Sequence, residues 1–180
     1  RIYSAGVVDP SFDARFSALG RSYAYRVSDR PEPLGRWDRL WVEETLDEAA
    51  MNEAGVALLG EHDFLGFCRP REGATTIRTL RTLRAERDSE GTLVFRVEAD
   101  AFCHSMVRSL VGALLLVGSG ARDTDYPAQI LRARSRSEAA PIAPAHGLTL
   151  EGVEYPDPSQ WGARAEQARA RRDTCCGDDG

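Results

Sequence analysis

The sequence predicts an α+β fold of the ferredoxin-like type, a split βαβ arrangement in which an antiparallel sheet has its helices packed on one face. Three observations lead to this prediction. Several segments alternate apolar and polar residues with the period of two that strands show. Two other segments place apolar residues at helical spacing. Along the chain, these segments follow the order strand, helix, strand, strand, helix, strand.

The first strand is expected at residues 22–27, where aromatic and aliphatic side chains alternate with small or polar ones. A stretch with two prolines and a glycine ends it. The first helix is expected to begin at a capping box formed by Thr45 and Glu48, because such side chains bind the free backbone N–H groups of a first turn. Its apolar face runs to Leu58, and Gly60 ends it.

A β-hairpin is expected next, formed by residues 76–87 and 92–99 around a turn that contains a glycine. The alternation in its second strand indicates that one face of the hairpin is buried. A second helix is expected over residues 104–117, where apolar residues recur at helical spacing before Gly118-Ser119-Gly120.

The rest of the chain contains a shorter helix around residues 127–134 and a final strand at 147–155, which two prolines close. Residues 1–156 are therefore expected to form one structured unit. Residues 157–180 are expected to be a polar tail that is partly helical and partly disordered.

The composition is that of a globular protein, since 42% of the 180 residues are hydrophobic and 28% are charged. The longest apolar run, residues 106–117, is shorter than the roughly 18 residues that cross a bilayer, so no membrane segment is expected. The four cysteines and three histidines are too scattered for a zinc site, so no metal is expected. The cysteines are interpreted as buried thiols in a reducing cytoplasm.

All 23 basic residues are arginines. The net charge of −5 argues against a nucleic-acid partner, yet arginines concentrate between Cys68 and Arg87. A guanidinium pairs with phosphate and stacks on bases, which favours RNA binding. The alternative is a solvated strand face, and genomic base composition alone can explain the absence of lysine. Charge therefore leaves the question of RNA binding open.

Arg108 is the only charged residue in the second expected helix. A guanidinium that loses its water without gaining a partner is costly, so one interpretation places Arg108 opposite a carboxylate or a phosphate. The other interpretation lets the side chain reach the surface at the start of the helix and gives it no role. The position in the helix does not decide between them.

Four sequence blocks resemble the motifs of the TruA-type tRNA pseudouridine synthase family and follow the order of that family. Together they cover the chain from Phe12 to about Tyr155. The blocks are residues 12–18 with Arg21 and Tyr23-Ala24-Tyr25, residues 60–64 with Phe67, residues 77–80, and residues 101–112 with the exit at 117–120.

The resemblance implies that residues 1–156 are the C-terminal catalytic and RNA-binding half of a pseudouridine synthase fold. It implies an isomerase that converts uridine to pseudouridine in the anticodon stem-loop of tRNA. It further implies a cytoplasmic homodimer that needs no cofactor and no metal. In this family an aspartate attacks the nucleotide, the glycosidic bond breaks, and the base rotates and rejoins through carbon.

The resemblance also assigns roles to single residues. Tyr23 matches the tyrosine that packs on the target base, where its face can stack on a flipped uracil while its hydroxyl moves a proton. Arg108 matches the basic residue that pairs with the nucleophilic aspartate, and such a pair lowers the pKa of the carboxyl group. RNA contacts are expected from four further residues: Arg15, Arg21, Arg78 and His104.

The loop that carries the nucleophilic aspartate in the family has no counterpart among these residues. Asp13, Asp63 and Asp100 stand in other contexts and do not replace it. Asp63 lies in a turn, where its side chain is expected to brace the backbone. We expect the nucleophile to lie in polypeptide upstream of Arg1, and the 180 residues alone to be inactive.

Two alternatives were weighed against this interpretation. A non-catalytic RNA-binding module with a ferredoxin-like fold would expose two or three aromatic residues on central strands, whereas the hairpin offers only Phe95. A small-ligand regulatory domain would explain neither Arg108 nor the arginine-rich strand. Without the motif, Tyr23 would be interpreted as a core residue.

Overall fold

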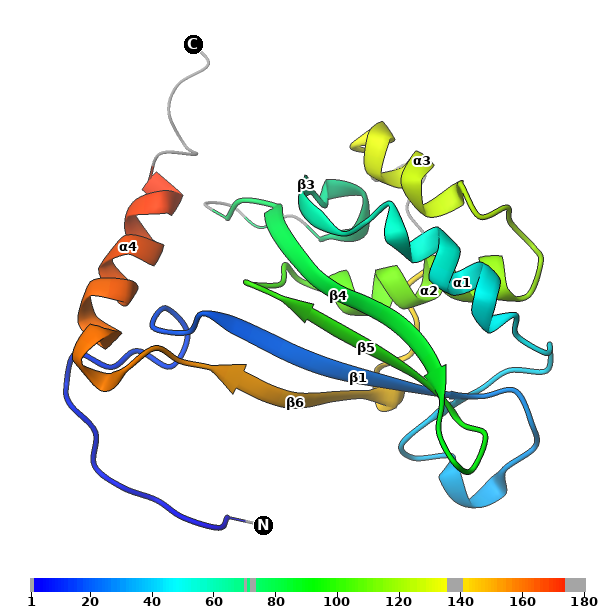
Figure 1. Cartoon of the computed structure of the whole chain (residues 1–180), viewed down its shortest axis with the longest axis horizontal. Helices are drawn as coiled ribbons and strands as arrows, with labels where there is room; N and C mark the ends of the chain where they lie inside the picture. The colour runs from blue at the N-terminus through cyan, green and yellow to red at the C-terminus, as the bar shows by residue number, and fades with distance from the viewer. Residues whose placement is uncertain (1, 70, 72–73, 136–140, 174–180) are drawn as a thin grey trace.

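The computed structural model describes residues 2–69, 71, 74–135 and 141–173, and it confirms the predicted α+β class (Figure 1). One twisted sheet forms a layer, and three helices lie against one of its faces. A fourth helix stands apart at the far end of the sheet, and its beginning lies beside the segment that leads into the first strand.

Four long strands build the ferredoxin-like part of the sheet. They are β1 (Gly20–Ser28), β4 (Ile77–Arg87), β5 (Leu93–Ala99) and β6 (Leu148–Glu154). β1 pairs with β6 on one side and β5 on the other, and β5 pairs with β4. These pairings place the strands in the order β6-β1-β5-β4, and all three are antiparallel. The predicted succession of elements therefore forms one continuous sheet.

The sequence did not predict two short strands at the margins of this sheet. β3 (Gly60–Asp63) pairs antiparallel with the outer edge of β4, and β2 (Leu40–Trp41) pairs parallel with the end of β1. Four and two residues are too few to show a reliable period, so only pairing with a neighbour reveals these strands.

The helix layer consists of α1 (Glu48–Val56), α2 (Met106–Gly118) and α3 (Tyr126–Ala133). The N-cap of α1 is Asp47, whose carboxylate accepts a hydrogen bond from the Ala50 backbone N–H at 3.0 Å. The capping box predicted from Thr45 and Glu48 is therefore wrong, because Glu48 is already the first helical residue. No helix of the described chain is long and apolar enough to cross a membrane.

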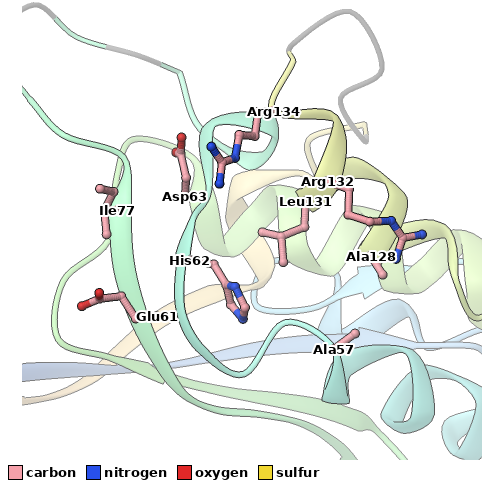
Figure 2. Close-up of a pocket in the computed structure, with 9 residues that line it drawn as sticks. All are labelled: Ala57, Glu61, His62, Asp63, Ile77, Ala128, Leu131, Arg132 and Arg134. Atoms are coloured by element: carbon pink, nitrogen blue, oxygen red, sulfur yellow. The ribbon is translucent and has the colours of Figure 1, made fainter.

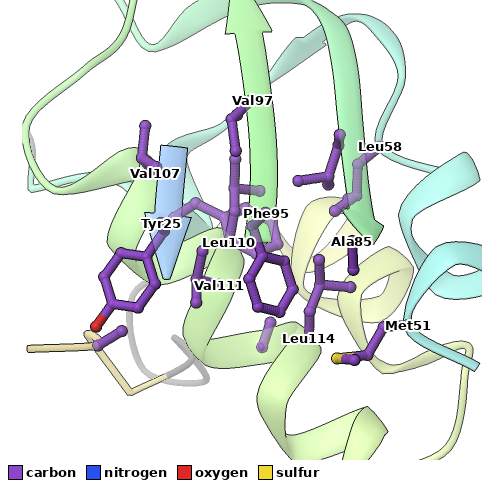
Figure 3. Close-up of a cluster of buried hydrophobic side chains, with 14 of the residues drawn as sticks. Tyr25, Met51, Leu58, Ala85, Phe95, Val97, Val107, Leu110, Val111 and Leu114 are labelled. Atoms are coloured by element: carbon purple, nitrogen blue, oxygen red, sulfur yellow. The ribbon is translucent and has the colours of Figure 1, made fainter. Parts of the chain in front are cut away.

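α2 lies at the centre of the core. Its Leu110, Val111 and Leu114 face Tyr25 of β1 and Phe95 of β5, and none of the five is more than 1% exposed (Figure 3). Burial of one such side chain stabilises the fold by about 1.5–3 kcal/mol. Because Phe95 belongs to the core, it does not present a ring to RNA, which removes the aromatic surface that a plain RNA-binding module needs.

The predicted tail contains a helix that packs against the beginning of the chain. This helix is α4 (Trp161–Asp173). The Phe12 ring lies 4.7 Å from the Trp161 ring and 5.0 Å from the Tyr155 ring, measured between centroids. The Ser17 hydroxyl donates a hydrogen bond to the Trp161 carbonyl at 3.0 Å. Residues 174–180 of the expected tail lie outside the described residues.

Cys68 and Cys103 are joined as a disulfide, with their Cα atoms 5.7 Å apart. Close by, the Arg69 backbone N–H donates to the His104 carbonyl at 3.0 Å and holds the same two segments together. The interpretation of the cysteines as thiols is therefore wrong for this pair, because packing brings together two residues separated by 35 positions. The other two, Cys175 and Cys176, lie outside the described residues.

Candidate active site

Tyr23 lies on β1, opposite Val97 of β5, and packs against the margin of the core. Phe102, in the connection between β5 and α2, meets its ring edge-on at a centroid distance of 5.1 Å. Tyr23 is half-buried, whereas Tyr25, two residues further along the same face, is fully buried. The strand therefore places one tyrosine in the core and leaves part of the preceding tyrosine ring accessible.

Arg108 lies in the first turn of α2 and is half-buried. Its Nε donates a hydrogen bond to the Ala143 carbonyl, and the Ala143 N–H donates to the Arg108 carbonyl at 3.1 Å. These two bonds fasten the segment before β6 to the helix. Among the described residues no carboxylate lies within ion-pair distance of Arg108, so none of them neutralises its positive charge.

Tyr25 connects the same elements from the strand side. Its hydroxyl donates a hydrogen bond of 2.7 Å to the Pro144 carbonyl, next to the Ala143 that binds Arg108. Burial raises the pKa of Tyr25 to about 12, because the phenolate is disfavoured away from water, while the nearby charge of Arg108 acts in the opposite direction. Arg108 and Tyr25 therefore bind neighbouring carbonyl groups, and Tyr23 lies two residues before Tyr25 on the same strand.

Arg21 and Arg15 lie together at the beginning of β1. The half-buried guanidinium of Arg21 donates to the Asp100 carbonyl at 3.0 Å and to the Arg15 carbonyl. Burial is the main cause that lowers the pKa of Arg21 below its ordinary value. Arg15 is exposed, and its guanidinium lies 5.4 Å from the centroid of the Phe16 ring. Two residues predicted to contact RNA are thus neighbours, close along the strand to Tyr23.

Arg78 and His104 differ in accessibility. Arg78 is only 8% exposed, and its guanidinium donates to the carbonyls of Ile77 and Thr75. A phosphate can reach only a small part of this side chain, so its role stays a prediction. His104 is exposed just before α2. The adjacent Ser105 has a φ of 69°, a left-handed conformation that is uncommon outside glycine and recurs at functional sites.

The three aspartates considered as substitutes for the nucleophile all hold local backbone in place. The brace predicted for Asp63 is confirmed, because its carboxylate accepts from the Leu65 N–H at 3.1 Å and from the Thr76 hydroxyl at 2.6 Å. The other two carboxylates also accept backbone N–H groups: Asp13 those of Arg15 and Phe16, and Asp100 those of Thr79 and Ala101.

A hollow of about 820 Å³ lies elsewhere, between β3 and α3 (Figure 2). Several of its polar side chains form local contacts. The His62 ring binds the Leu59 carbonyl at 2.9 Å, and Arg132 pairs with Asp125 at 2.8 Å. None of the residues predicted from the motifs to act on RNA lines this hollow, so it is separate from the candidate active site.

Three residues of the candidate site were not singled out from the sequence. Phe102 lies in the sequence block of residues 101–112, so the resemblance to the family could have indicated it. Ala143 and Pro144 carry none, because their contacts with Arg108 and Tyr25 use backbone carbonyl groups, which every residue possesses.

Comparison with known proteins adds two findings. The model of a family described as tRNA pseudouridine synthase matches residues 54–156. Proteins named tRNA pseudouridine synthase A are similar over nearly the whole chain. The relative from Frankia casuarinae is 54% identical over 175 residues, which cover 96% of this chain and 64% of the relative. Those from Streptomyces griseus and Corynebacterium glutamicum are 52% and 41% identical, over 94% and 96% of this chain and 61% and 62% of their own lengths. The chain thus spans less than two thirds of the length of each of these relatives.

Proposed function

Because this chain belongs to the tRNA pseudouridine synthase family, we propose that it forms the Tyr23 and Arg108 side of the active site in an isomerase that converts uridine in tRNA to pseudouridine. One observation carries this proposal. The guanidinium of Arg108 has no carboxylate partner among the described residues, and it binds the Ala143 carbonyl, next to the Pro144 carbonyl that Tyr25 of β1 binds.

The nucleophilic aspartate comes from polypeptide outside these 180 residues. An ionised carboxylate beside RNA is opposed by the negative phosphates, and the positive charge of Arg108 favours it, since an adjacent cation lowers the pKa of a carboxyl group. The bond between Arg108 Nε and Ala143 fixes one side of the guanidinium. Its two terminal nitrogens then face the incoming carboxylate as a fork.

Tyr23 acts on the base. Its accessible ring provides a surface on which a flipped uracil can stack, and Phe102 holds that ring from the side. In the isomerisation the bond from the sugar to nitrogen breaks and a bond to carbon forms, so that carbon loses a proton and the nitrogen gains one. We expect the Tyr23 hydroxyl to take part in this proton movement.

The RNA partner is the anticodon stem-loop of tRNA, and the enzyme acts as a homodimer in the cytoplasm. Arg15 and Arg21 support the anticodon stem-loop as partner, because neither forms an ion pair with a described carboxylate and Arg21 lies two residues before Tyr23 on β1. His104 is exposed just before α2 and is therefore accessible to RNA. Arg78 binds RNA only if its guanidinium exchanges its hydrogen bonds to the Ile77 and Thr75 carbonyls for bonds to the RNA.

A chimaeric protein tests this proposal. The portion of the Frankia relative that this chain does not match is joined to residues 1–180, and tritium release is measured from tRNA labelled at the uridine carbon that loses its proton. We expect turnover by the chimaera and none by the 180 residues alone. Tyr23→Phe and Arg108→Gln should each lower kcat by roughly a hundredfold or more.

Arg122→Gln serves as the matched control, because Arg122 is exposed and its guanidinium lies over the Tyr126 ring, remote from the candidate site. Turnover by residues 1–180 alone would contradict an external nucleophile. Tight tRNA binding by a chimaera that shows no turnover would favour the non-catalytic RNA-binding module instead.

A further inference from the structure

α4 brings a third arginine to the pair formed by Arg15 and Arg21. The helix is fixed on the segment that carries Arg15, because Arg169 pairs with Asp13 at 2.8 Å. The Arg169 guanidinium also lies 4.9 Å from the centroid of the Phe16 ring.

Arg164 lies where this helix meets the rest of the protein. The next residue, Ala165, is only 2% exposed, so this part of α4 is packed and its side chains are held in place. The Nε of Arg164 is shielded from solvent, yet no acceptor lies within hydrogen-bond distance in the described part of the chain. A buried N–H group without an acceptor is rare in folded proteins, and it indicates an acceptor that the described residues do not supply.

The charge of Arg164 acts on Arg21. Burial is the main cause that lowers the pKa of Arg21. The neighbouring Tyr155 and Tyr23 act in the opposite direction, and the positive charges of Arg164 and Arg15 lower the pKa further. None of these three arginines forms an ion pair with a described carboxylate. Three like charges that gather without a counter-charge repel one another, and a bound anion relieves that repulsion.

We propose that Arg15, Arg21 and Arg164 together bind a phosphodiester group of the RNA backbone. Guanidinium groups match phosphate oxygens in shape as well as charge. Arg21 lies two residues before Tyr23 on β1, so a nucleotide whose base stacks on Tyr23 carries its backbone past this site. The assignment of the anion to RNA rests on the proposed function, while the three-arginine cluster does not.

The contribution of Arg164 is not one that the family match assigns. α4 lies beyond residues 54–156, the segment that the family model covers. The site therefore joins two arginines of the first strand region with one from the C-terminal helix.

Binding of tRNA to residues 1–180 at several salt concentrations tests the site. Arg164→Gln should raise Kd roughly tenfold and reduce the slope of log Kd against log salt concentration by about one unit, the effect of one lost phosphate contact. Arg164→Lys should retain most of the slope, because it keeps the charge. Arg122→Gln removes an exposed arginine far from the cluster and should leave slope and Kd nearly unchanged. Thermal unfolding of each variant controls for loss of structure.

A second variant tests the site at an exposed position, where the substitution should not disturb folding. Arg15 is exposed, so Arg15→Gln should fold normally and also lower the slope. In the double variant with Arg164→Gln, the two effects should fall short of additivity, because both side chains bind one group. Full additivity, or an unchanged slope in both single variants, would overturn the proposal.

An RNA hairpin unrelated to tRNA separates this inference from the proposed function. If both RNAs bind equally and the slope depends on Arg164, the site stands while the preference for tRNA fails. If neither RNA binds, the site as an RNA-backbone contact is wrong.

Discussion

Tyr25 and Pro144 lie 119 positions apart in the sequence, and a hydrogen bond of 2.7 Å joins the hydroxyl of one to the carbonyl of the other. This bond ties the segment before β6 to the central strand. The preceding residue, Ala143, binds both the backbone and the Nε of Arg108. The direction of the Arg108 guanidinium therefore depends on a segment that is remote from it along the chain.

Alkaline pH should weaken the fold through Tyr25. Its folded pKa of about 12 lies above the ordinary value of 10.0, so the unfolded chain loses the phenolic proton first. The stabilisation by neutral Tyr25 is complete below the unfolded pKa and is lost as pH rises toward the folded one. The free energy of unfolding in urea should fall more steeply between about pH 10 and pH 12 for the wild type than for Tyr25→Phe. Equal slopes would show that the pKa of Tyr25 is not raised.

Gly112→Ala should displace the segment that holds Arg108. A Cβ atom at Gly112 would lie 1.8 Å from the Pro141 carbonyl oxygen, far closer than atoms can approach. The carbonyl belongs to backbone, so the segment must move, and we expect a loss of about 2–4 kcal/mol in unfolding free energy. Urea denaturation measures it.

Gly55→Ala provides the matched control, since Gly55 also lies in a helix but its added Cβ would meet Leu83 only at an ordinary 3.5 Å. That variant should be neutral or stabilised by up to about 1 kcal/mol, because alanine favours the helix. A Gly112→Ala protein as stable as Gly55→Ala would contradict the tight contact.

Asp29→Asn should destabilise the junction of β1, α1 and β4. The Asp29 carboxylate accepts two hydrogen bonds from Arg87, at 2.7 and 3.0 Å, and one from the Leu46 N–H at 3.1 Å. The bonds from Arg87 are the main cause that lowers the pKa of Asp29. We expect a loss of about 2 kcal/mol, less than for a fully buried pair because Arg87 is 27% exposed.

The same pair should contribute to acid unfolding. A lowered folded pKa means that the stabilisation is present above the unfolded pKa, near 3.8, and disappears as pH falls through the folded value. Unfolding free energies at decreasing pH should therefore converge for wild type and Asp29→Asn. Glu86→Gln is a suitable control, because the Glu86–Arg96 pair lies on the exposed sheet surface. A constant gap between wild type and Asp29→Asn at all pH values would exclude this linkage.

Reduction of the bond between Cys68 and Cys103 should lower stability without unfolding the protein. The bond closes a loop of 35 positions, for which chain entropy predicts a contribution of roughly 3–4 kcal/mol. Thermal unfolding with and without a reducing agent measures the difference. The Cys68→Ala/Cys103→Ala variant should unfold at the same temperature under both conditions. A wild type that is equally indifferent to reduction would contradict the bond.

Much of the fold could be predicted because its signals are local. β1, β4, β5 and β6 each show a period of two or a strand-forming composition, and the turns between elements carry glycine or proline. The start of α1 was predicted incorrectly because the local signal is ambiguous. Thr45 and Asp47 are both good capping residues, and only the path of the chain selects Asp47.

The sequence by itself determined the order of the elements, the side chains that form the core, and the motif positions of Tyr23 and Arg108. Periodicity and turn chemistry act between near neighbours, so they can be read along the chain. The tertiary structure alone decided three sets of contacts: those of Arg108 and Tyr25 with the carbonyls of Ala143 and Pro144, the packing of α4 against the segment before β1, and the pairing of Cys68 with Cys103. These contacts join residues that are far apart in sequence, and several use backbone groups common to every residue. No local pattern can encode them, because they arise only when the helices pack on the sheet.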